Sequence, residues 1–240
     1  MKIHDIIISN KKNKSLKIGG DFMVDKNKWL PTGIDKIRES FVFNAKKVLK
    51  SNIAYNIQYL QYLYMDINSS DSTTVLYRMR YKSFVITGMS IIEAVFMALL
   101  KDRKLIPLEE WKEVGNHKHQ MIDDKTINVI IKRKKVSPFE KKIKFDEAIT
   151  LIEKNNVLNL DKSSIVVIRK LQDLRNHLHL DKAEELCSSD YNCFNEKIYF
   201  IMKLVLYYIL ANENVSNDES YLDFLRPLKT DFDKYILQSK

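Results

Sequence analysis

Residues Phe84 to Leu100 read FVITGMSIIEAVFMALL. As a helix, this stretch is apolar on nearly every side, and such a helix is normally packed by other elements all around it. We therefore expect a helix from about Thr74 to Lys101 at the centre of an all-α fold. The segment before it, Asn68 to Thr74 (NSSDSTT), is rich in side chains that favour turns and helix N-caps.

Glu93 is the acidic residue inside this apolar stretch. On a helix it shares a face with Met89, Phe96 and Leu100. Burying a carboxylate there without a partner would cost several kcal/mol. Two interpretations stay open: Glu93 lies at the edge of the buried stripe and reaches water, or it faces a cation from another helix.

Helical patterns continue on both sides of the central stretch. Apolar residues at three- and four-residue spacing predict one long helix or two in series between Ile34 and Tyr64. We divide the chain into an N-terminal arm with a helical extension, residues 1–70, and a helical domain, residues 71–240, with an insertion at about 105–160. Later helices are expected over Phe145 to Leu158, from Ile165 onward, over Phe194 to Leu210 with Asp190 to Asn192 as its cap, and from about Tyr221 to Leu237.

The insertion contains a strand signal followed by a basic run. Thr126 to Ile131 is rich in β-branched residues and leads into the run Lys132, Arg133, Lys134 and Lys135. With Lys141 to Phe145 as the second strand and Ser137-Pro138 in the connection, it predicts a small basic β-hairpin. The basic run either prevents strand pairing at an exposed edge or contacts a phosphate backbone. We expect His117 and His119, earlier in the insertion, to be loop residues.

Composition limits the class of protein. The chain has 240 residues, 45% of them hydrophobic, with 5 Gly and 4 Pro, which argues against a loop-rich sandwich. Its net charge of +9 makes a polyanion a better candidate partner than a basic substrate. Two cysteines are too few for a disulfide framework, and we expect a cytoplasmic protein with no membrane segment.

The candidate functional residues lie in Leu171 to Leu180, which reads LQDLRNHLHL. On a helix, Arg175 and His179 are four positions apart and share one face. Arginine suits a phosphate geometrically, and histidine titrates near neutral pH. This is the equipment for cleaving RNA through its own 2′-hydroxyl, with His179 or His177 moving a proton and Asn176 orienting the groups. No metal or other cofactor is then required.

Two other interpretations of the same residues stay open. His177 and His179 with Cys187 and Cys193 are possible zinc ligands, although the spacing between the cysteines is loose for zinc, and the two histidines would point about 200° apart on a continuous helix. Alternatively, Arg175 and Asn176 make ordinary hydrogen bonds at a helix end.

The residues Leu174-Arg175-Asn176-His177-Leu178-His179-Leu180 resemble the signature of the HEPN superfamily, which comprises small helical domains of prokaryotic toxins and abortive-infection proteins. The order of elements is similar too: an acidic residue in an earlier apolar helix, here Glu93, then an insertion, the Arg-Asn helix and a further apolar helix. The resemblance covers about residues 75–215.

The resemblance implies a HEPN-like helical bundle with an N-terminal extension and a small basic β-hairpin-like insertion. It implies a metal-independent ribonuclease site formed by Arg175, Asn176 and His179 with Glu93 beside them, RNA as substrate, a homodimer, and an antitoxin or defence partner. The basic run Lys132 to Lys135 would then steer RNA. Because Arg175 and His179 lie closer together than in most catalytic members, a non-catalytic RNA-binding or protein-interaction module is the alternative.

Overall fold

Helix α4 (Thr74–Asp102) is the central element of the fold, and it extends one residue beyond the predicted end. The computed structural model describes residues 30–69, 73–120, 126–176 and 190–227, and the statements below concern these ranges. Within them, α4 contacts α3, α5, α6, α8 and α9. Its apolar composition is therefore accounted for by neighbours on several sides, as the sequence predicted.

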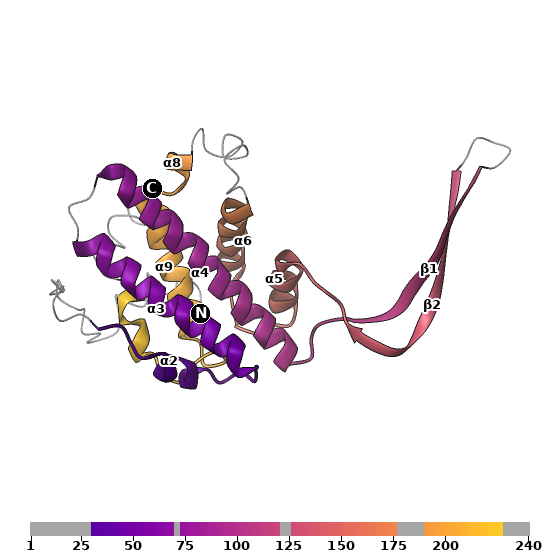
Figure 1. Cartoon of the computed structure of the whole chain (residues 1–240), viewed down its shortest axis with the longest axis horizontal. Helices are drawn as coiled ribbons and strands as arrows, with labels where there is room; N and C mark the ends of the chain where they lie inside the picture. The colour runs from indigo at the N-terminus through magenta and orange to yellow at the C-terminus, as the bar shows by residue number, and fades with distance from the viewer. Residues whose placement is uncertain (1–29, 70–72, 121–125, 177–189, 228–240) are drawn as a thin grey trace.

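The other helices share one core with α4, and α2 and the 3-10 helix η1 reach it through α3 and α9 (Figure 1). Residues from both sides of position 70 contribute to that core, for example Ile57 from α3 and Phe96 from α4. The helical part of residues 1–70 thus packs directly onto the rest of the bundle. The other helical elements are α2 (Ile34–Ser40), α3 (Lys47–Ser69), α5 (Phe145–Lys154), α6 (Lys162–Asn176), α8 (Asp190–Cys193), α9 (Glu196–Leu210) and the 3-10 helix η1 (Ser220–Leu225).

Helices α4 and α9 approach each other closely at Gly88. A Cβ atom on Gly88 would lie 2.9 Å from Leu206 Cδ1 and 3.0 Å from Met202 Cε. Glycine in a helix interior costs about 1 kcal/mol of helix propensity relative to alanine. Here that cost is offset by the close packing of two strongly apolar helices.

The cap of α9 differs from the predicted one. Asp190 to Cys193 form the short helix α8, and the Asn195 side chain accepts a hydrogen bond from the Ile198 backbone N–H at 3.0 Å. The prediction of a cap at Asp190 to Asn192 was wrong because Asn195 is also a good capping residue and directly precedes the apolar run.

Strands β1 (Leu108–Gln120) and β2 (Thr126–Glu140) form an antiparallel ribbon that stands away from the helical body (Figure 1). A hairpin was predicted, but with the wrong second strand. The partner of β2 is β1, whereas Lys141 is outside the ribbon and Phe145 begins α5. The sequence of β1, LEEWKEVGNHKHQ, lacks the apolar alternation of a half-buried strand, because the ribbon covers no core.

The register of the ribbon corrects two further expectations. His117 and His119 are strand residues opposite Val129 and Ile127, and not loop residues. Pro138 lies within β2 and not in the connection between the strands. It falls where the register shifts between Glu109 and Trp111, and an irregularity of this kind accommodates a residue that has no N–H.

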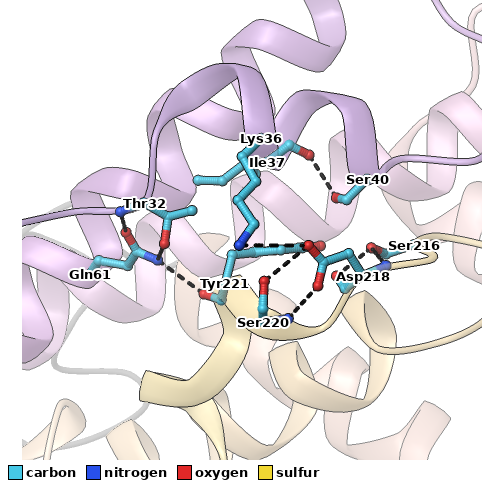
Figure 2. A network of polar contacts seen from close by, with 9 residues as sticks. All are labelled: Thr32, Lys36, Ile37, Ser40, Gln61, Ser216, Asp218, Ser220 and Tyr221. Atoms are coloured by element: carbon cyan, nitrogen blue, oxygen red, sulfur yellow. Dashed lines mark hydrogen bonds and ion pairs between the residues drawn. The ribbon is translucent and has the colours of Figure 1, made fainter.

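A polar network joins the first helices to the C-terminal part of the bundle (Figure 2). The buried Gln61 side chain donates to the Thr32 hydroxyl and to the Tyr221 carbonyl, each at 3.0 Å, and accepts from the Thr32 N–H. Nearby, the backbone N–H and hydroxyl of Ser220 donate to Asp218 and hold the pKa of that carboxyl below its usual value. The network holds α2 and α3 against residues 216–221, which lead into η1.

Among the described residues, α4 is the one helix long and apolar enough to cross a membrane, and 61% of its most apolar window is buried inside the protein. Its place in the core accounts for this composition.

Candidate functional site

The two charged residues singled out from the sequence meet in the folded chain. Glu93 from α4 and Arg175 from α6 form an ion pair, with Arg175 Nη1 2.5 Å from Glu93 Oε2. They lie 82 positions apart in the sequence. The contact is the one expected if Glu93 faces a cation from another helix.

Local sequence accounts for how each partner reaches the other. Glu93 lies at the margin of the buried face of α4, and it directly follows the fully buried Ile92. Arg175 lies in the last turn of α6, where the helix dipole favours a cation. Contacts between α4 and α6 bring these two positions together.

The ion pair is only partly buried. The Arg175 side chain is 29% exposed and the Glu93 side chain is 37% exposed. The other interpretation of Glu93, that it reaches water at the edge of the buried stripe, therefore also holds. Nη1 is one of two terminal guanidinium nitrogens, and a guanidinium has five N–H donors, so the pair with Glu93 leaves it able to contact an anion from solvent.

Because the pair is partly exposed, its contribution to stability should be small. A double-mutant cycle with Glu93→Ala, Arg175→Ala and the double variant should give a coupling free energy of about 0.5 to 1 kcal/mol. A fully buried pair would instead lose about 3 to 5 kcal/mol when one partner is removed. Urea unfolding measures the coupling without adding salt, and a coupling near the buried value would contradict this account.

Of the remaining candidate residues, the structure describes Asn176 and Cys193. Asn176 is exposed and ends α6. His179 and His177 lie outside the described residues, as does Cys187. Cys193 ends α8, is buried in the core and is disulfide-bonded, so it is not available as a zinc ligand in this structure. In the described ranges, no group of three or more His, Cys, Asp or Glu side chains is arranged to hold a metal ion.

The four residues of the basic run on β2 differ in their exposure to solvent. Lys132, Arg133 and Lys134 are exposed. Lys135 instead forms an ion pair, with its Nζ 3.2 Å from Glu109 Oε2, and its side chain is only 13% exposed. The run is on the ribbon and the ion pair is on the helical body, and they form no common cluster among the described contacts.

A hollow that the sequence did not indicate lies elsewhere. It has a volume of about 310 Å³ and is lined by Lys36, Glu39, Ser40, Asn217 and Asp218. Residues from two distant parts of the chain form it, and no local pattern marks either part. Neither Glu93 nor Arg175 lines it.

Comparison with protein-family models, with curated proteins and with solved structures found no match to this chain.

Proposed function

We propose that the protein is a metal-independent endoribonuclease of HEPN type, acting in the cytoplasm in a defence or toxin role. The observation that carries this proposal is the ion pair between Arg175 and Glu93. It holds a guanidinium at the protein surface in the last turn of α6, and His177 and His179 follow in the sequence. A partly exposed arginine in a fixed position is suited to binding a phosphate.

In the proposed reaction, Arg175 binds the non-bridging oxygens of the scissile phosphate. A base removes the proton of the 2′-hydroxyl, and the 2′-oxygen forms a bond to phosphorus. The bond from phosphorus to the 5′-oxygen breaks, and an acid protonates that oxygen. The products are a 2′,3′-cyclic phosphate and a 5′-hydroxyl.

Each residue of the site has one role in this scheme. His179 serves as the general acid or base, because an imidazole exchanges protons near neutral pH. Asn176 orients the reacting groups, and Glu93 positions the Arg175 guanidinium. A metal ion is not required, because arginine supplies the positive charge for the phosphate.

The experiment that tests this chemistry uses a substrate without the nucleophile. An RNA with a known cleavage position should be cut in EDTA and leave a 2′,3′-cyclic phosphate end. The same RNA with a single 2′-deoxy nucleotide at that position should not be cut there, while other positions are cut as before. Equal cleavage of both substrates would rule out attack by the 2′-hydroxyl.

The second candidate function is a non-catalytic RNA-binding or protein-interaction module. The same ion pair favours it, because Glu93 engages Arg175 and links α4 to α6 as a structural contact would. If the protein is such a module, folded wild-type protein should leave the RNA intact in the cleavage assay described above.

A further inference from the structure

The second strand of the ribbon continues into a basic strip. From Lys132 to Lys144 the chain has seven Lys or Arg residues and one Glu. Two of the seven are paired with carboxylates, Lys135 with Glu109 and Lys141 with Glu147. The other five are exposed: Lys132, Arg133, Lys134, Lys142 and Lys144. An exposed strip with this excess of cations is complementary to a polyanion.

Two large aromatic side chains are exposed on the ribbon, one within this strip and one on the opposite strand. Trp111 of β1 is 50% exposed and Phe139 of β2 is 54% exposed. Each has a lysine nitrogen over its ring: Lys134 Nζ is 6.0 Å from the Trp111 ring centroid, and Lys135 Nζ is 3.5 Å from the Phe139 centroid. The register places Lys134 opposite Trp111, so these two side chains belong to one face of the ribbon.

Edge protection does not account for this arrangement. Lysine alone discourages pairing at an open strand edge, and exposed Trp and Phe rings work against that effect. A ligand that offers both flat rings and phosphates accounts for the exposed aromatic rings and for the exposed cations near them.

We propose that Trp111 and Phe139, with the cations beside them, form a stacking platform for unpaired bases of single-stranded RNA. The inference rests on the proposed ribonuclease function and names the class of its substrate. Aromatic rings stack on bases that are not held in a helix, while the exposed Lys132, Arg133 and Lys134 contact the backbone between those bases. Glu109, Glu110 and Glu113 on β1 reduce the net charge of the ribbon, and stacking on the rings would add a preference for unpaired bases that charge alone does not give.

The fluorescence of Trp111 on the ribbon can be used to measure this binding. The chain has two tryptophans, Trp29 and Trp111, so full-length protein with Trp29→Phe emits from Trp111 alone. An unlabelled 10-nucleotide single-stranded RNA should quench this emission. The same strand in a duplex, a strand of equal charge without bases, and poly-glutamate should leave it nearly unchanged. Arg175→Ala can be added to prevent cleavage during the titration.

Variants assign the contact to the aromatic ring. By fluorescence anisotropy of labelled RNA, Trp111→Ala should weaken binding about tenfold, and Trp111→Phe should restore most of it. Val114→Ala is the matched control, because Val114 is a 54% exposed residue on the same strand without an aromatic ring, and its replacement should change the affinity little. The slope of log affinity against log salt should lie near −2 to −3, as expected for about three or four phosphate contacts to a single strand.

Some results would overturn the inference. Binding that is equal for the single strand, the duplex and the strand without bases would show that the ribbon attracts charge without stacking. Unchanged affinity in Trp111→Ala would exclude the ring. The ribonuclease proposal fails separately: RNA bound by the ribbon with no cleavage contradicts the proposed function alone, and cleavage without Trp111-dependent binding contradicts this inference alone.

Discussion

Replacing Arg175 with alanine should reduce the rate of RNA cleavage by at least about 100-fold, which corresponds to roughly 2.7 kcal/mol of transition-state stabilisation. The reason is that the developing charge on the phosphate loses its fixed cation. The variant should remain folded, because the Glu93–Arg175 pair is partly exposed and contributes little to stability. Single-turnover cleavage rates measured alongside thermal unfolding test both statements.

Arg169 provides the matched control for this variant. It lies on the same helix, it is 33% exposed, and it is paired with Asp146 of α5. Arg169→Ala removes the same charge and a similar ion pair on α6 at a different position. Cleavage should therefore stay within about twofold of wild type. Equal losses in the two variants would show that general electrostatic attraction, and not a site at Arg175, determines the rate.

Replacing Phe96 with alanine should lower the free energy of unfolding by about 3 to 5 kcal/mol. Phe96 is fully buried in α4, and its ring centroid lies 5.9 Å from that of Phe145 at the start of α5. Its removal leaves a cavity where the central helix meets α5. Urea or thermal unfolding monitored by circular dichroism measures the loss.

Val166→Ala is the control for this core variant. Val166 is a 50% exposed residue on α6, and its truncation should change stability by less than about 0.5 kcal/mol. A small effect of Phe96→Ala would contradict the assignment of α4 as the central packed helix.

The helical core was largely predictable from the sequence. Helix α4 was predicted to within one residue because its side chains are apolar on nearly all faces, a pattern typical of a helix that other elements surround. The two helices in series before it follow from apolar spacing as well. The cap of α9 was placed too early, because several polar residues that favour caps precede that helix.

The ribbon was predicted only in part. The β-branched residues of β2 revealed one strand, but β1 is polar and charged and gives no strand signal of its own. An exposed two-stranded ribbon needs no apolar face, so alternation is missing where the structure has a strand.

The sequence predicted the residue types of the candidate site and one contact within it, the one between Glu93 and Arg175. The lone carboxylate in α4 required a partner or access to water, and the structure gives it both: Arg175 and partial exposure. The degree of exposure depends on how α4 and α6 pack, which no local pattern encodes. The hollow beside Asp218 was missed for the same reason, since its lining comes from distant segments.

The most direct test of the central claim is the cleavage rate of His179→Ala in EDTA, measured with its melting temperature. The proposed mechanism predicts that wild type cleaves RNA without metal, and that the variant loses cleavage by about 100-fold or more with a melting temperature within about 2 °C of wild type. Full cleavage by the variant, or no cleavage by folded wild type, would contradict the claim. A large fall in melting temperature would assign His179 to the structure and support the non-catalytic module.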